Sequence, residues 1–147
     1  MTEANQLIMQ ALQQQWSLAS PGVADIFWSS TRFETVDFDR AAKNFVVACY
    51  SPTGPSQTTP LTRELWLKTE QVIVDVLVKV VGTVDDAVAA RENMRREVER
   101  IIHMSEFTIS SLAEAVVARE PVQVEASNLV RVSVQVTCKS FQIREPV

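Results

Sequence analysis

The sequence predicts a single α+β domain in which helices pack on a mainly antiparallel sheet. Three observations support this prediction: a helical pattern at 84–104, an alternating pattern at 130–139, and a long strand pattern at 64–81 with apolar residues on both faces. The elements follow the order helix, strands, long helix, strands, which is typical of α+β domains rather than of repeated βαβ units. With 147 residues and no break in composition, the chain is expected to form one domain over 1–147.

A first helix is predicted over residues 3–18. Ile8, Leu12 and Trp16 recur every four residues on one face, while glutamines occupy the opposite face. A Ser-Pro-Gly sequence follows, and it is expected to end the helix because proline and glycine interrupt helical backbone. We expect this helix to cover one side of the sheet.

Two strands, a loop and a long strand are predicted next. Residues 25–38 are rich in aromatic and β-branched side chains, which favours one strand or a strand with a bulge, and FVVACYS at 45–51 is a short apolar strand. Residues 51–62 contain three prolines and a glycine, so we expect no regular structure there and infer a projecting hairpin arm. Residues 64–81 are apolar on both faces, which predicts a central strand covered on both sides.

The pattern at 84–104 is the clearest helical signal in the chain. Thr83 is the predicted N-cap, with an aspartate three residues later in a variant of the capping box. Only Arg91 interrupts the apolar stripe, and we expect it either to extend its charged end to solvent or to pair with a carboxylate across an interface. Glu92 and Arg96 have the i,i+4 spacing of a helical ion pair. The other faces are predicted to be polar and include Glu92, Arg95, Arg96, Glu97, Glu99 and Arg100.

The C-terminal third is predicted to be mostly extended. Residues 105–120 fit either a short helix or an extended segment, and extended structure is favoured in the later half. Apolar and polar residues alternate from 130 to 138, which predicts an antiparallel strand with one face on the core and one in solvent. Residues 122–126 continue this alternation, so a hairpin that turns near 127–128 is expected.

Composition argues against several classes of function. The net charge of −4 differs from the basic surplus of a chain that neutralises nucleic-acid phosphates. No apolar run approaches the roughly 20 residues that span a bilayer, and the first residues lack the pattern of a signal peptide. Cys49 and Cys138 lie far apart in apolar runs, so we expect two buried, reduced thiols in a chain of cytosolic origin.

The residues that usually perform catalysis have no suitable partners in the sequence. The single histidine, His103, ends a charged helix, where an imidazole suits the helix dipole. One histidine and two widely spaced cysteines do not build a zinc site, and the three isolated glycines form no phosphate-binding loop. We therefore expect no enzymatic activity, no cofactor and no metal.

Surfaces for assembly are easier to find. The helix arginines alternate with glutamates, which favours a solvated or intersubunit ion-pair face over a helix that reads DNA. An aromatic residue beside a projecting arm is of a type favoured at interface hot spots. The candidate interface residues are Trp66, Arg91, Arg95, Arg96, Arg100, Pro55 and Gln57.

The layout of four segments resembles the tail terminator and neck (tail-completion) proteins of long-tailed viruses. These segments are LIMQALQQQW near the start, the strand LWLKTEQVIVDVLVKV, the helix ARENMRREVERII and the terminal strand LVRVSVQVTCKSF. The resemblance covers nearly the whole chain, but it concerns layout rather than a diagnostic motif.

The resemblance implies a virion structural subunit that is assembled in the host cytoplasm. Members of this family form rings, usually hexameric, that cap the tail tube and join it to the neck or portal. The implied partners are further copies of the chain, the tail tube protein and the neck or connector proteins, and the resemblance implies no membrane. Genomic DNA would pass through the ring without sequence-specific binding, and a mildly acidic chain suits such a conduit because it repels phosphate.

A small-ligand α+β domain, either cone-shaped or like a hot-dog thioesterase, is the alternative. Long curved strands around one long helix would enclose a pocket with a few convergent polar groups. Asp75, which is buried by alternation in an apolar strand, and His103 are the only candidates for such groups.

Overall fold

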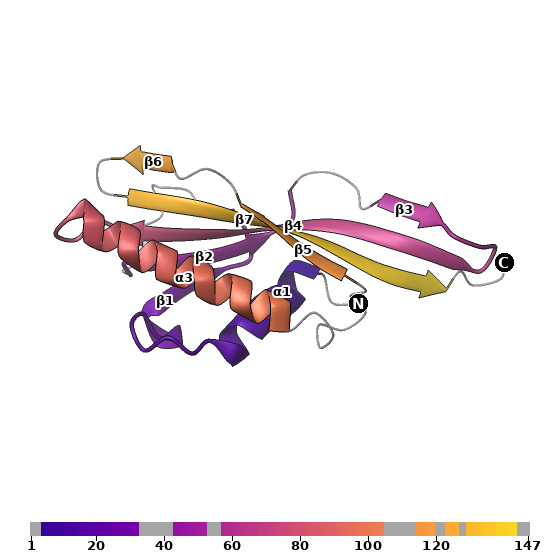
Figure 1. The fold of residues 1–147 in the computed structure, drawn as a ribbon, viewed down its shortest axis with the longest axis horizontal. Coiled ribbons are helices and arrows are strands. Elements are labelled where there is room, and N and C mark those ends of the chain that lie inside the picture. Colours follow the sequence, from indigo (N-terminus) through magenta and orange to yellow (C-terminus); the bar gives the residue numbers. More distant parts are fainter. Residues whose placement is uncertain are drawn as a thin grey trace.

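The computed structural model describes residues 4–32, 43–52, 57–104, 114–119, 123–126 and 129–143. Two helices, α1 (Ala4–Gln15) and α3 (Val84–Met104), pack on one long twisted sheet (Figure 1). The predicted α+β class is confirmed. The strands are β1 (Ile26–Ser29), β2 (Phe45–Tyr50), β3 (Gln57–Pro60), β4 (Leu65–Lys79), β5 (Glu114–Arg119), β6 (Gln123–Ala126) and β7 (Leu129–Ile143).

The sheet is built on the pairing of β4 with β7. These two strands are antiparallel along their full length, from Leu65 opposite Ile143 to Lys79 opposite Leu129. The strand order is β1-β2-β4-β7-β5, with β3 paired to β4 and β6 paired to β7. All of these pairs are antiparallel except β1 with β2, which is parallel. The central position predicted for the long apolar strand is confirmed.

The main core lies between the sheet and the two helices. Successive side chains of a strand point to opposite faces, so every second residue meets the helices in the part of β4 and β7 that the helices cover. The apolar stripe of α3 and one face of α1 complete this core. Its buried members include Ile8, Leu12, Ile26, Val47, Val72, Val74, Val76, Met94, Val98, Ile101, Ile102, Val132, Val134 and Val136.

A smaller cluster covers part of the opposite face of the sheet. Val46, Ala48, Leu77 and Leu129 are buried there, with Phe27 and Tyr50 packed beside them. Burial on both faces is therefore confirmed for the second half of β4. In its first half, residues 65–71 are all partly or fully exposed, which limits the prediction of double coverage to the second half.

The connection from β4 to α3 is set by two neighbouring residues. Gly82 has φ 102°, a backbone conformation that residues other than glycine rarely adopt. Thr83 then accepts a hydrogen bond at its Oγ1 from the backbone N–H of Asp86, at 3.2 Å. The predicted N-cap is therefore confirmed, and the helix bounds agree with the sequence pattern.

Near the N-terminus, two predicted elements are shorter than expected. Helix α1 ends at Gln15 rather than at residue 18, and the indole of Trp16 donates to the carbonyl of Pro21 at 2.9 Å. The strand predicted at 25–38 covers only Ile26–Ser29 of the described residues. It ends in a turn, in which the Ser29 hydroxyl donates to the carbonyl of Thr31 at 2.8 Å. Residues 33–38 lie outside the described part of the chain.

The proline-rich segment contains a strand, which corrects the expectation of no regular structure at 51–62. Strand β3 pairs with Trp66–Thr69 of β4, and Pro60 is its last residue. Proline is tolerated at this place because β3 has only β4 as a neighbour among the described strands, so no second ladder needs its N–H. The chain turns back over 61–64, where the N–H of Leu61 donates to the carbonyl of Leu65 at 2.9 Å.

The extended structure predicted for the C-terminal third is also present. Strand β5 confirms an extended later half of 105–120, whereas 105–113 and 120 are not described. Strands β6 and β7 pair as a hairpin, as predicted, although 127–128 lie outside the described residues. Buried and half-exposed residues alternate along 130–138, which confirms a strand with one face on the core.

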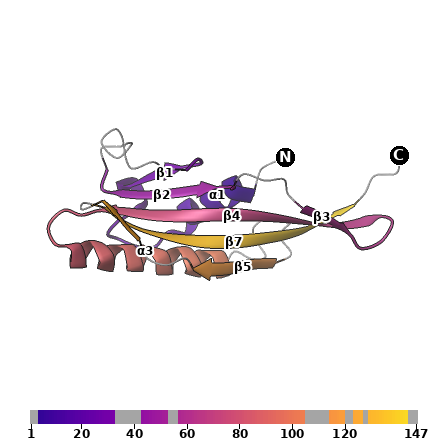
Figure 2. The same cartoon turned by 90° about the horizontal axis from the view of Figure 1, so that it is seen from above.

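The sheet continues well past the helices as a projecting arm (Figures 1 and 2). We define the arm as β3, residues 65–70 of β4 and residues 139–143 of β7. Neither α1 nor α3 covers it in either view. The predicted hairpin arm is thus confirmed. It consists of the hairpin of β3 and β4 together with the end of β7. Neither described helix is long and apolar enough to cross a membrane.

Candidate interaction surfaces

One flank of α3 holds a partly buried ion-pair network centred on Arg95, whose side chain is 11% exposed. Its guanidinium lies 2.7 Å from Oε2 of Glu92 and 2.9 Å from Oε1 of Glu99. Burial raises the pKa of Glu92, but the hydrogen bond and charge of Arg95, with Arg91, outweigh this and lower it below its ordinary value. The predicted ion pair between Glu92 and Arg96 is wrong. Arg96 is exposed, and the i,i+3 and i,i+4 partners of Arg95 occupy the neighbouring face instead.

Arg91 is buried in the apolar stripe rather than extended to solvent. Its Nη2 lies 3.3 Å from Oε1 of Glu92, while Nε and Nη1 have no hydrogen-bond partner in the described part of the chain. Of the two sequence-based expectations, the solvent-reaching one is wrong because the side chain is enclosed on all sides. Arg91 does pair with a carboxylate, but the partner is the adjacent Glu92 of the same helix.

Glu97 is buried, although the sequence pattern assigned it to a polar face. Its Oε2 accepts the backbone N–H of Ser17 at 2.8 Å and the Ser17 hydroxyl at 2.5 Å. Its Oε1 accepts the Nε of Arg100, whose Nη2 also donates to the carbonyl of Gln15 at 2.9 Å. The cluster joins the end of α1 to the side of α3. Glu97 follows Met94 by three residues and precedes Ile101 by four, so its helical spacing was the available signal.

In the arm, Trp66 lies on β4 opposite Pro60 and Gln142 and is half-buried. Gln57 begins β3, with its backbone opposite Thr69. Pro55 lies outside the described residues. The predicted interface residues therefore fall in two groups, with the arginines on α3 over the body and Trp66 with Gln57 in the arm.

A polar cluster lies on the face of the sheet opposite the helices. Asp75 is buried, and its Oδ2 accepts the hydroxyl of Tyr50 at 2.8 Å while its Oδ1 accepts that of Ser133 at 2.5 Å. Burial raises the pKa of Tyr50 above its ordinary value, and the charge and hydrogen bond of Asp75 add to this. The three residues are brought together by strand register, because Asp75 pairs with Ala48 of β2 and with Ser133 of β7.

The groups considered for a small-ligand site do not meet. Asp75 faces away from the helices, whereas His103 is exposed near the end of α3 on the other side of the sheet. Each oxygen of Asp75 already accepts a hydroxyl from within the chain. The arrangement at Asp75 is therefore that of a satisfied structural carboxylate.

The cysteines are free thiols, as predicted. Cys49 and Cys138 are both buried and unpaired with each other. Burial raises the pKa of Cys49 to about 12, with a further contribution from the charge of Asp75. Burial likewise raises the pKa of Cys138 to about 12. Within the described ranges, no group of three or more His, Cys, Asp or Glu residues could hold a metal ion.

Comparison with known proteins identifies the fold rather than a family. No family model matches the chain, and no curated protein sequence matches it. Among solved structures, the chain is similar to a component of the virion of a native gene transfer agent particle. The TM-score is 0.59 at 11% sequence identity, and the match covers 95% of this chain and 95% of the other. A likeness at this identity shows a shared fold over almost the full length of both chains.

Proposed function

We propose that this chain is a virion structural protein, a ring-forming subunit that caps a tail tube and joins it to the head–neck connector. The observation that supports this most directly is the end-to-end match with a component of a virion. The match covers the helices, the sheet and the arm together, since it leaves only a small part of either chain uncovered. The sequence resemblance to tail terminator and neck proteins gives the finer role.

The shape of the subunit supports assembly into a ring. A ring is a closed heterologous assembly, so each subunit needs two different surfaces that meet in turn. The helix-covered body and the helix-free arm are two such surfaces, and they lie at different ends of one molecule (Figure 1). By resemblance, the ring has six copies, with the tail tube protein on one side and neck or connector proteins on the other.

Charge supports a conduit for DNA rather than a DNA-binding surface. The net charge is −4, and the arginines 91, 95 and 100 of α3 are paired with glutamates of the same helix. A surface with few unpaired cations gains little from contact with phosphate. Genomic DNA would pass through the ring without sequence-specific binding, and the role requires no catalysis and no cofactor.

Electron microscopy together with light scattering tests the proposal. The purified chain is measured over a range of concentrations, alone and with tail tubes that lack a terminator. We expect rings with a central hole, of about six copies by the resemblance, or rings seated on the tube ends. A chain that stays monomeric alone and does not bind tube ends would contradict the proposed role.

A further inference from the structure

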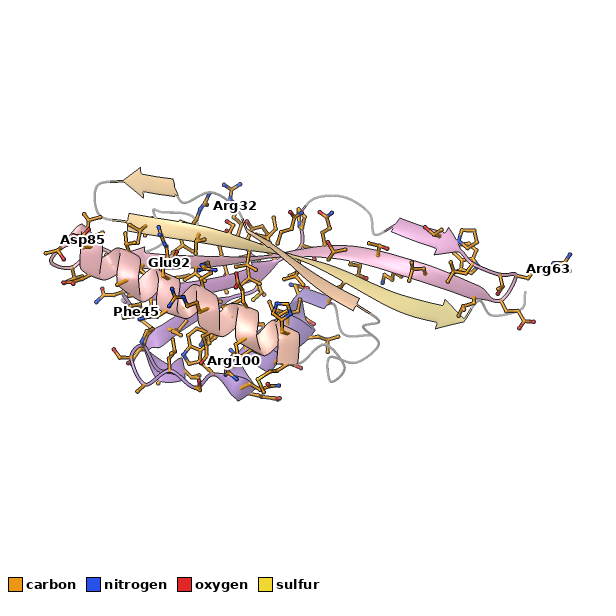
Figure 3. All side chains as sticks on the ribbon, viewed as in Figure 1. Arg32, Phe45, Arg63, Asp85, Glu92 and Arg100 are labelled. Carbon is orange, nitrogen blue, oxygen red and sulfur yellow. The ribbon has the colours of Figure 1, made fainter. Side chains whose placement is uncertain are left out.

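The two extreme ends of the subunit carry exposed groups of complementary chemistry. One end is the turn of the arm, residues 61–64, which we call the arm tip. The other end is the connection from β4 into α3, residues 81–86, which we call the helix-start patch. Figure 3 shows Arg63 and Asp85 at the two opposite ends of the long axis. A single copy cannot bring these two ends together.

Both ends carry apolar side chains that are about half exposed or more. Leu61 at the arm tip is 48% exposed, while Val81 and Val84 in the helix-start patch are 67% and 48% exposed. Single exposed apolar residues are common on protein surfaces. Here, however, two of them lie within one turn of chain at one end, and a third lies at the tip of a projecting arm. Contact between the ends would remove all three from water.

Arg63 at one end and Asp85 and Asp86 at the other carry opposite charges. Arg63 at the arm tip is exposed and forms no ion pair with any described residue, and the same holds for Asp85 and Asp86. By contrast, Lys68 within the arm pairs with Glu70 at 2.5 Å. Glu64 follows Arg63 at the tip, so complementarity depends on the side chain of Arg63 rather than on the net charge of the turn.

We propose that the arm tip of one copy docks on the helix-start patch of a second copy of this chain. Leu61 packs against Val81 and Val84, and Arg63 pairs with Asp85 or Asp86. The two surfaces differ and lie at opposite ends, so the contact is heterologous and leads from copy to copy in one direction. This inference rests on the proposed ring and assigns the residues that close it.

Charge reversal on the full chain tests the contact. Arg63→Glu places like charges opposite each other, and a double Asp85→Lys, Asp86→Lys variant does the same from the other side. We expect each variant alone to raise the apparent dissociation constant of assembly in sedimentation velocity at least about tenfold. An equimolar mixture of the two variants should restore assembly, because alternating copies then present a normal or a fully reversed contact at every junction. Glu64→Gln, one residue from Arg63, is the matched control and should assemble as the wild type does.

Cysteine cross-linking gives a second, geometric test. A Leu61→Cys copy mixed with a Val84→Cys copy should form a disulfide-linked dimer on mild oxidation. Met104→Cys is the matched control, because it is also exposed and lies on the same helix about 30 Å from position 84. Equal cross-linking of Leu61→Cys to both partners would contradict the proposed docking.

The outcomes separate this inference from the proposed function. If Arg63→Glu forms rings as readily as the wild type, the docking is wrong while the ring role stands. A wild-type chain that stays monomeric alone and on tail tubes contradicts both. Loss of assembly in the single variants and its recovery in the mixture support the docking at these residues.

Discussion

Glu97 accepts two hydrogen bonds from Ser17, a residue 80 positions away in the chain. One comes from the backbone N–H at 2.8 Å and the other from the hydroxyl at 2.5 Å, both to the same carboxylate oxygen. Arg100 binds the other oxygen and the carbonyl of Gln15, the last residue of α1. Carbonyls at the end of a helix have no partner within it, so Arg100 supplies one from α3. One acidic residue thus anchors α1 to the body of the subunit.

Removal of this carboxylate should destabilise the fold. Glu97→Ala leaves the Ser17 N–H and the Arg100 guanidinium without their acceptor, and we expect the free energy of unfolding to fall by about 1–3 kcal/mol. Urea denaturation followed by circular dichroism measures this. Arg96→Ala, an exposed neighbour, is the control and should change the free energy by less than about 0.5 kcal/mol. Equal effects of the two substitutions would show that the cluster contributes nothing to stability.

The same residue should make stability depend on pH in the acidic range. Burial raises the pKa of Glu97, but the hydrogen bonds from Arg100 and Ser17 outweigh burial and hold the pKa below its ordinary value. A lowered pKa in the folded state means that the contribution is complete above the unfolded value of about 4.3 and is lost as pH falls through the folded value. The difference in free energy of unfolding between the wild type and Glu97→Gln should therefore shrink below about pH 4. A difference that is the same at pH 7 and pH 3 would contradict this assignment.

The sequence was sufficient for elements set by local pattern and insufficient for contacts set by strand register. The periodicity of 84–104 and its Thr83 cap predicted α3 correctly, because helix signals lie within a few residues of one another. The strand β3 was missed because its stability depends on a partner strand rather than on its own composition. The partners of Asp75 could not be predicted either, because Tyr50 and Ser133 contact it only once β2, β4 and β7 are aligned.

Substitutions in the Asp75 cluster should have non-additive effects on the free energy of unfolding. Asp75→Ala leaves two half-buried hydroxyls without their shared acceptor, and we expect a loss of about 3 kcal/mol in the free energy of unfolding. Tyr50→Phe and Ser133→Ala each remove one donor and should cost about 1–2 kcal/mol. Once Asp75 is alanine, either second substitution should cost much less than it does in the wild type. Strict additivity in this double-mutant cycle would contradict a shared carboxylate.

Arg91 should destabilise the isolated subunit rather than stabilise it. The guanidinium is buried, and its Nε and Nη1 have no hydrogen-bond partner among the described residues. Desolvation of such a charge exceeds the gain from its one ion pair with Glu92. Arg91→Met keeps an apolar side chain of similar length and leaves Glu92 with Arg95. We expect the free energy of unfolding to rise by about 1 kcal/mol or to stay unchanged. A loss above about 2 kcal/mol would show that Glu92 alone compensates for the buried charge.

The two thiols should report on opening of the fold. Burial raises the pKa of Cys49 and of Cys138 to about 12, and at pH 8 this lowers the reactive thiolate fraction about a thousandfold relative to a free cysteine. Access is also blocked, because both side chains are buried in the core. Labelling by a disulfide reagent at pH 8 should therefore require opening of the fold, and it should accelerate in Glu97→Ala about tenfold for each 1.4 kcal/mol of lost stability. Immediate labelling of either thiol in the native protein would contradict this. Slow labelling would also mean that Cys49 and Cys138 do not interfere with the cross-linking of Leu61→Cys to Val84→Cys.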